Sequence, residues 1–364
     1  MSTQRDGFMP DCQRPDGKVD VSIVVPCRNE VRYIRMFLEN LLHQDYGGLS
    51  WEAIIADGMS DDGTRELLKD FSHPQIFWID NPEGIVSTGL NRAIRRARGE
   101  YVLRMDLHAD YAPDYVRRSV ETLVETGADN AGGPARTRAE GYIALAIAAA
   151  YHSAFACGGA RFHDERYEGY VDTVTYGCWR RSTLERLGLF DEGLVRNQDD
   201  ELNLRIIRAG GRIWQSPRIV SWYVPRSSLW ALARQYFQYG FWKVAVIRKH
   251  RIPASWRHLV PGMFVLGALG LPAGALFCWG AGLPSAAAGI SATWGGLMGL
   301  YLAASIAAAV WTARRRGFGI VMVLPVVFAC YHFSYGLGFL SGLVHLRLRP
   351  RGEAARKLYT GLTR

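Results

Sequence analysis

The sequence predicts an α/β protein with a mostly parallel central sheet, followed by a C-terminal α-helical membrane region. From residue 19 onward, short runs rich in apolar residues alternate with amphipathic helical patterns, which is typical of a parallel sheet covered by helices. Residues 259–313 contain no Asp, Glu, Lys or Arg, and neither do residues 317–345. Both stretches therefore have the composition of membrane-buried helices.

The first part of the chain yields an ordered series of elements. Besides a strand at 21–25 and a helix at 30–44, strands are expected at 51–56, 76–79, 101–105 and 171–176, and helices at 64–71, 86–98, 113–126 and 201–209. Residues 142–157 are apolar but shorter than the roughly 20 residues that span a bilayer, so we expect a buried or interface-lying helix. Residues 230–247 are aromatic on one side and basic near the end, which is typical of a helix in the headgroup region.

Changes in composition divide the chain into five segments. These are a disordered leader at 1–18 without the apolar core of a secretory signal, an α/β domain at 19–225, amphipathic interface helices at 226–258, a transmembrane region at 259–345 and a basic tail at 346–364. The transmembrane region holds about three segments, at 259–279, 286–310 and 318–344. The six cysteines show no C-x-x-C pairing, so neither a disulfide framework nor a zinc site is expected.

Basic residues flank the apolar region and account for much of the net charge of +9. This pattern favours anionic membrane lipids, and no nucleic acid, as partners. The positive-inside rule places Arg314, Arg315 and Arg316 in the cytoplasm, together with the N-terminal domain. A third segment that crosses once would leave the basic tail outside, whereas a re-entrant segment bent near Pro325, or around the glycines at 336 and 338, would keep it inside. The sequence leaves both arrangements open.

Polar residues follow the first two predicted strands. The first strand runs into Pro26, Arg28 and Glu30, and the second ends at Asp57. The carboxyl edge of an open parallel sheet is where such folds bind ligands, so these residues are candidates for binding a nucleobase or ribose. A dinucleotide-binding fold would need G-x-G-x-x-G after the first strand, and this sequence has PCRNE instead.

The fourth predicted strand ends in an acidic turn. Asp106, His108 and Asp110 lie two residues apart, a spacing that places alternate side chains on one side of an extended segment. A hard divalent ion such as Mg²⁺ or Mn²⁺ is commonly held by one or two protein ligands and by substrate phosphates. Taken alone, this short pattern is more often found in a solvated loop than at a metal site.

A second acidic group precedes the helix expected at 201–209. Asp199 and Asp200 follow Gln198, and carboxylates here complement the dipole at a helix N-terminus. The functional alternative is a carboxylate that removes a proton from a hydroxyl group of an acceptor.

Taken together, the motifs resemble glycosyltransferase family 2, whose members have the GT-A nucleotide-sugar-binding fold. The chain carries PCRNE, DGMSDDGT, DLHAD and GLFDEGLVRNQDDELNLRIIRAGG in the family's order and at its spacing, over roughly residues 19–225. The D-x-H variant, the ARQYFQYGFWKV stretch and the apolar C-terminal segments are similar, more narrowly, to bacterial succinoglycan-type exopolysaccharide glucosyltransferases.

The resemblance implies roles for individual residues. The nucleoside would lie against Pro26, Arg28, Glu30 and Asp57, and the rest of the donor against Asn81, Gly84, Asn91 and Asp106. A divalent metal, Mn²⁺ or Mg²⁺, would be held by Asp106 and His108. Asp199 would be the catalytic base, with Asp200 in reserve, and Arg234, Gln235 and Lys243 would contact a diphosphate or the acceptor. Two departures from the family pattern are His108 in place of a second Asp and Gln198 in place of a Glu.

The function implied is inverting, metal-dependent transfer of a sugar, glucose from UDP-glucose, onto a polyprenyl-diphosphate-linked saccharide in exopolysaccharide biosynthesis. The enzyme would lie in the bacterial inner membrane with a cytoplasmic catalytic domain. Two alternatives stay open: a processive polysaccharide synthase, and a non-catalytic membrane protein that uses a degenerate transferase domain as a binding module.

Overall fold

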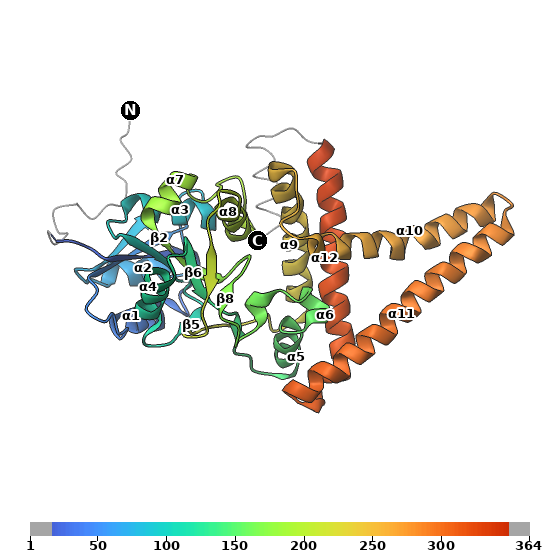
Figure 1. The fold of residues 1–364 in the computed structure, drawn as a ribbon, viewed down its shortest axis with the longest axis horizontal. Helices are drawn as coiled ribbons and strands as arrows, with labels where there is room; N and C mark the ends of the chain where they lie inside the picture. The colour runs from blue at the N-terminus through green and yellow to red at the C-terminus, as the bar shows by residue number, and fades with distance from the viewer. Residues whose placement is uncertain (1–16, 349–364) are drawn as a thin grey trace. The chain divides into compact units, whose positions relative to one another are not determined.

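The computed structural model describes residues 17–348, so the leader up to residue 16 and the basic tail from residue 349 lie outside the described residues. The chain forms two compact units (Figure 1). Unit 1 holds residues 17–137 and 161–224, and unit 2 holds residues 138–160 and 225–348. Residues 138–160, expected inside the first domain, thus cluster with the C-terminal helices.

Unit 1 is built on an eight-stranded sheet with the order β3-β2-β1-β4-β9-β6-β10-β8. Strands β1 to β4 are parallel neighbours, and β9 runs antiparallel between β4 and β6. The strands are β1 Val21–Cys27, β2 Trp51–Asp57, β3 Ile76–Asp80, β4 Tyr101–Arg104, β6 Asn130–Gly133, β8 Gly169–Tyr170, β9 Thr175–Arg180 and β10 Ile213–Gln215. A second sheet joins β5 (Ala109–Tyr111), β11 (Ser221–Tyr223) and β7 (Arg136–Thr137).

The central strand β1 is apolar because helices cover both faces of the sheet. Alternate residues point to opposite faces, so Ile23 and Val25 belong to one core cluster and Val24 belongs to another. The first core also takes in residues of α1 (Ile34–Leu42) and α4 (Tyr115–Thr126). The second takes in residues of α3 (Val86–Arg96), α7 (Arg181–Leu187) and α8 (Gln198–Arg208), while the short α2 (Thr64–Asp70) follows β2.

Two predictions for unit 1 are wrong in detail. The helix expected at 30–44 begins only at Ile34, because a turn closes first: the amide of Tyr33 donates to the carbonyl of Glu30. The strand expected at 171–176 begins only at Thr175, as β9, while β8 ends at Tyr170, before the expected strand starts. Tyr176, inside β9, has a φ of 61°, a left-handed conformation that is rare for a residue with a side chain.

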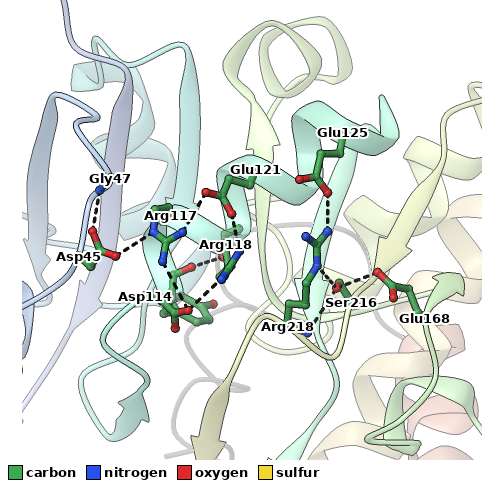
Figure 2. Close-up of polar contacts among 12 residues, drawn as sticks. Asp45, Gly47, Asp114, Arg117, Arg118, Glu121, Glu125, Glu168, Ser216 and Arg218 are labelled. Carbon is green, nitrogen blue, oxygen red and sulfur yellow. Dashed lines mark hydrogen bonds and ion pairs between the residues drawn. The ribbon is translucent and has the colours of Figure 1, made fainter.

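A charged network covers the exposed side of α4 (Figure 2). Arg117 contacts Asp45 (2.9 Å) and Glu121 (3.1 Å), and Arg118 contacts Asp114 (3.1 Å) and Glu121 (3.0 Å). These side chains are a quarter to a half exposed, so water and salt screen their charges. They hold α4 to the loop that carries Asp45 and contribute little to stability.

All regular secondary structure that the described residues of unit 2 form is helical. Its helices are α5 Tyr142–Tyr151, α6 Ala154–Cys157, α9 Leu229–His250, α10 Val260–Gly280, α11 Pro284–Arg316 and α12 Leu324–Leu348. Three helices are long and apolar enough to cross a membrane: Trp256–Gly280, Pro284–Arg316 and Leu324–Leu346. This agrees with the three segments expected from the sequence.

Helix α9 packs along α12 at a very short distance (Figure 1). A Cβ atom at Gly240 would overlap the carbonyl oxygen of Tyr335, and one at Gly338 would overlap that of Phe237. Glycine is therefore required at these two positions, because the backbones touch where membrane helices pack through small residues. The segment expected to lie in the headgroup region thus packs along a candidate membrane span, and its place relative to a membrane stays a prediction.

One prediction for unit 2 is also wrong. The apolar segment at 142–157 breaks into α5 and α6, because Ser153 is extended (ψ 129°) between them. For the third segment, the bend considered around the glycines at 336 and 338 does not occur, because α12 runs unbroken through both; Pro325 lies in the first turn of this helix. Proline is tolerated there, because the first amides of a helix have no partner within the helix.

Candidate active site

The carboxyl ends of four parallel strands meet at one edge of the unit 1 sheet. In register, Cys27 at the end of β1 lies opposite Asp57 at the end of β2, and Asp57 lies opposite Asp80 at the end of β3. On the other side of β1, Val24 lies opposite Arg104, the last residue of β4. The polar residues expected from the sequence are therefore neighbours at this edge.

Asp57 has no exposed surface. Its carboxylate accepts hydrogen bonds from the hydroxyl (2.5 Å) and amide (3.1 Å) of Ser60, and from Arg65 (2.6 Å). Arg65 also contacts Asp80 at 2.9 Å and lies over the ring of Trp78. Asp57 thus fixes the turn after β2, and a nucleobase could reach it only if Arg65 or Ser60 moved.

The turn after β1 is tied to the loops around it. The amide of Asn29 donates to Ser60 Oγ (2.8 Å), and that of Glu30 donates to Thr64 Oγ1 (2.9 Å). Arg28 is half-buried and lies near the carbonyl of Gly84, at 3.4 Å. Pro26, the remaining donor candidate on this strand, is also half-buried, so the rim of the edge is formed by Pro26, Arg28 and Glu30.

Asn81 and Asn91 do not line the edge with free amides. Asn81 is 3% exposed, donates to the carbonyl of Ile85 (2.9 Å) and accepts from the hydroxyl of Thr88 (2.8 Å). Asn91 is 2% exposed and forms a two-way bridge with the backbone of Phe190, at 2.8 and 2.9 Å. Both side chains hold loops in place, so they offer no surface to a donor.

Arg104 holds Asp106 by two hydrogen bonds, Nε to Oδ1 at 2.8 Å and Nη2 to Oδ2 at 2.9 Å. The side chains are only 8% and 13% exposed. The hydroxyl of Tyr111 accepts from the amide of Asp106 (2.6 Å) and donates to its carbonyl (3.1 Å). Burial raises the pKa of Tyr111 well above its usual value, so this hydroxyl stays protonated. Backbone and side chain of Asp106 are both fixed.

His108 is oriented by Glu30. Its Nδ1 lies 3.1 Å from a carboxylate oxygen of Glu30. A carboxylate in its ionised form can only accept, so this contact favours the tautomer of His108 that carries its hydrogen on Nδ1 and its lone pair on Nε2. Histidines that bind metals are commonly held by a carboxylate in this way.

The donor set fits a divalent ion bound mainly through substrate. Asp106 and His108 leave most of the coordination shell to other groups, and the described residues contain no cluster of three or more His, Cys, Asp or Glu suited to a metal. Mg²⁺ and Mn²⁺ are often held by one or two protein ligands and by phosphate oxygens. Asp110, the third member of the turn, lies in β5, where it pairs in register with Trp222.

Asp199 and Asp200 lie in the first turn of α8, where Asp199 Oδ1 accepts from the amide of Asp200 at 2.9 Å. Burial alone would lower the pKa of Arg104, but the carboxylate of Asp106 and, after it, that of Asp199 raise this pKa above its ordinary value. The negative charges of both carboxylates therefore favour the charged form of the Arg104 guanidinium. Gln198 is 6% exposed, and its Oε1 has no hydrogen-bond partner within residues 17–348.

The candidate contacts on α9 belong to unit 2 and differ in exposure. Arg234 is exposed, Gln235 donates to the hydroxyl of Tyr239 (3.0 Å), and Lys243 is 4% exposed. Nine residues correspond to two and a half helical turns, so Arg234 and Lys243 point in opposite directions. They cannot both contact one diphosphate from the same face of α9.

Sequence reasoning missed the arginines of this edge, Arg65 and Arg104. Arg104 stands two residues before Asp106, a spacing that places both side chains on one face of a strand and was a usable signal. Left-handed backbone conformations offer a second, structural signal. Among the described residues other than glycine, six have a positive φ: Asn29, Met59 and Asn197 lie within two residues of a candidate site residue, whereas Tyr176, Leu189 and Arg251 do not.

Comparisons with known proteins agree with this architecture. Residues 22–178 match the model of the family "Glycosyl transferase family 2". The chain is 30% identical to the succinoglycan biosynthesis protein ExoA of Rhizobium meliloti, over 90% of this chain and 96% of that protein. It is 26% identical, over 89% of this chain and 97% of the relative, to the dolichyl N-acetyl-alpha-D-glucosaminyl phosphate 3-beta-D-2,3-diacetamido-2,3-dideoxy-beta-D-glucuronosyltransferase of Methanococcus voltae.

A solved structure shares the fold. It is the mannosyltransferase PcManGT from Pyrobaculum calidifontis, in complex with GDP-Man and Mn²⁺, with a TM-score of 0.56 and 20% identity. The alignment covers 93% of this chain and 91% of that one. With the mostly parallel sheet and the family match, these similarities establish that the chain is a glycosyltransferase with a GT-A-like domain and belongs to glycosyl transferase family 2.

Proposed function

We propose that this glycosyltransferase moves a hexose from a nucleotide-diphosphate sugar, UDP-glucose first among the candidates, onto a lipid-linked saccharide in the synthesis of an exported polysaccharide. The observation that carries the proposal is the edge of the sheet where the carboxyl ends of four parallel strands meet, with Asp57 at the end of β2 and the fixed carboxylate of Asp106 just after β4. A departing diphosphate and an attacking hydroxyl both need groups of this kind at a single place.

The acceptor class is supported by unit 2 and by the relatives. One relative is named for succinoglycan biosynthesis and another for transfer to a dolichyl-phosphate-linked sugar. Three helices with the composition of membrane spans would keep such a lipid within reach of the enzyme. Arg314, Arg315 and Arg316 end α11, and the positive-inside rule places this cluster in the cytoplasm, where nucleotide sugars are made.

On the donor side, the nucleoside would lie over the rim formed by Pro26, Arg28 and Glu30. Arg28 would contact the diphosphate, since its guanidinium is half-buried beside the loop of Gly84. Asp57 would act indirectly, because its carboxylate holds Ser60 and Arg65 and so shapes the floor of the nucleoside site.

Asp106 and His108 would hold the divalent ion, Mn²⁺ or Mg²⁺. When bound, the ion offsets negative charge on the diphosphate as it departs. Glu30 would keep His108 in the tautomer whose lone pair is on Nε2, and Tyr111 would keep the Asp106 backbone from moving.

Asp199 would take the proton from the attacking hydroxyl of the acceptor, with Asp200 as the alternative base. Attack from the face opposite the nucleotide would invert the anomeric centre. The unpartnered amide oxygen of Gln198 would accept a hydrogen bond from a sugar hydroxyl beside Asp199.

The test is a panel of nucleotide sugars incubated with the purified full chain, a polyprenyl-diphosphate saccharide and Mn²⁺, scored by released nucleotide and by product mass. One sugar should be added per acceptor, and Asp199→Asn should lower turnover by at least about 100-fold while UDP still binds. Asp70→Asn, at the exposed end of α2, is the matched control and should turn over normally. Normal turnover by Asp199→Asn would eliminate this base, and a long product ladder would identify a processive synthase.

A further inference from the structure

We propose that Arg104 is a positioning residue that fixes the Asp106 carboxylate in the orientation in which it binds the metal. This inference rests on the proposed role of Asp106 as a metal ligand. Neither the family's motifs nor the other assignments require an arginine at this place.

The geometry of the pair is the first support. Arg104 contacts both oxygens of Asp106, at 2.8 and 2.9 Å, so the carboxylate cannot rotate without breaking a hydrogen bond. A carboxylate has about four lone-pair positions, and Arg104 occupies one on each oxygen. The remaining positions point away from the guanidinium, and they are the ones that Asp106 can offer to a metal.

Burial is the second support. The side chain of Arg104 is 8% exposed, and an arginine so deep in a protein needs a permanent counter-charge. Asp106 supplies that charge directly, through both of its carboxylate oxygens.

This arrangement has a consequence for metal affinity that a purely structural arginine would not have. A fixed positive charge beside Asp106 weakens the attraction of the site for a divalent cation. Removing it should tighten Mn²⁺ binding roughly ten-fold, the usual effect of one unit charge a few ångströms away in a partly buried site. The same change should lower turnover, because the carboxylate is free to rotate and to take up unproductive geometries.

The experiment compares Arg104→Met and Arg104→Lys with the wild type in the full chain. Mn²⁺ affinity is measured at saturating UDP from the electron paramagnetic resonance signal of free Mn²⁺, which needs no turnover. Arg104→Met should bind Mn²⁺ roughly ten-fold more tightly and turn over at least about ten-fold more slowly. Arg104→Lys keeps the charge but makes only one contact, so its Mn²⁺ affinity should stay within about two-fold while turnover falls.

Arg117→Met is the matched control, because Arg117 also contacts two carboxylates but lies in the surface network on α4 (Figure 2). Its Mn²⁺ affinity and turnover should equal those of the wild type. The inference is wrong if folded Arg104→Met binds Mn²⁺ as tightly as the wild type or less tightly. It is also wrong if Arg104→Lys keeps full activity, and this second variant still gives a result if Arg104→Met does not fold. If the wild type binds no Mn²⁺, or Asp106→Asn leaves its binding unchanged, the proposed metal site itself fails.

Discussion

Replacing Arg65 by methionine tests whether the turn after β2 is held by a buried charge pair. Arg65 contacts Asp57 at 2.6 Å and Asp80 at 2.9 Å, and Asp57 has no exposed surface. Removing one partner of a buried ion pair costs about 3–5 kcal/mol, because the other charge is left unpaired. The side chain of Arg65 is 17% exposed, so solvent screening reduces the expected loss to about 2–3 kcal/mol.

For a domain of this size, such a loss lowers the melting temperature by about 4–12 °C. The measurement is thermal unfolding of the full chain in detergent, followed by near-ultraviolet circular dichroism. Arg117→Met, which also removes two carboxylate contacts but at the surface, should leave the melting temperature unchanged.

Adding Asp57→Asn to Arg65→Met should recover at least half of the lost stability, because the buried group is then neutral. If Arg65→Met melts like the wild type, or if the double variant is no more stable than Arg65→Met alone, a buried charge pair does not hold this turn.

Three further predictions concern other parts of the chain. Gly338→Leu should separate α9 from α12, because the leucine side chain would overlap the carbonyl of Phe237. The detergent-solubilised variant should lose its monodisperse peak in size-exclusion chromatography, and an unchanged elution profile would contradict the close packing of the two helices. Asp20→Asn should lower the melting temperature at pH 7, because hydrogen bonds from the hydroxyl and amide of Ser50 lower the pKa of Asp20 in the folded protein. The stability that this carboxylate contributes is present above its unfolded pKa of about 4 and is lost as the pH falls through the lower folded pKa. The melting temperatures of the two proteins should therefore converge at still lower pH. Glu52→Gln should destabilise the fold by about 1–3 kcal/mol in thermal unfolding, because the buried Glu52 carboxylate accepts from a hydroxyl, a backbone amide and a guanidinium; an unchanged melting temperature would show that these contacts are replaceable.

Much of the fold could be predicted because period-two and helical patterns are local properties of the sequence. The apolar strand at Val21–Cys27 and the polar turns after β1, β2 and β4 identify the carboxyl edge without any structure. The uncharged stretches identify the candidate membrane spans in the same way. These signals depend on neighbouring residues alone.

The features that could not be predicted depend on contacts between residues that lie far apart in the sequence. Asn91 bridges to Phe190, nearly a hundred residues away, so its burial is invisible in any local pattern. Long side chains such as Arg65 reach in directions that strand and helix periodicity do not fix. The segment 138–160 joins the C-terminal helices because its alanine-rich face packs on α12, a choice that its own composition does not determine.

The most direct test of the account is a structure of the full chain with UDP-glucose and Mn²⁺, in which anomalous scattering locates the ion. We expect the ion to be bonded to Asp106, to Nε2 of His108 and to the diphosphate, with Asp199 facing the anomeric carbon on the side opposite the nucleotide. An ion bound away from Asp106, or a sugar lying out of reach of Asp199, would contradict the central claim that these two carboxylates serve one transfer reaction.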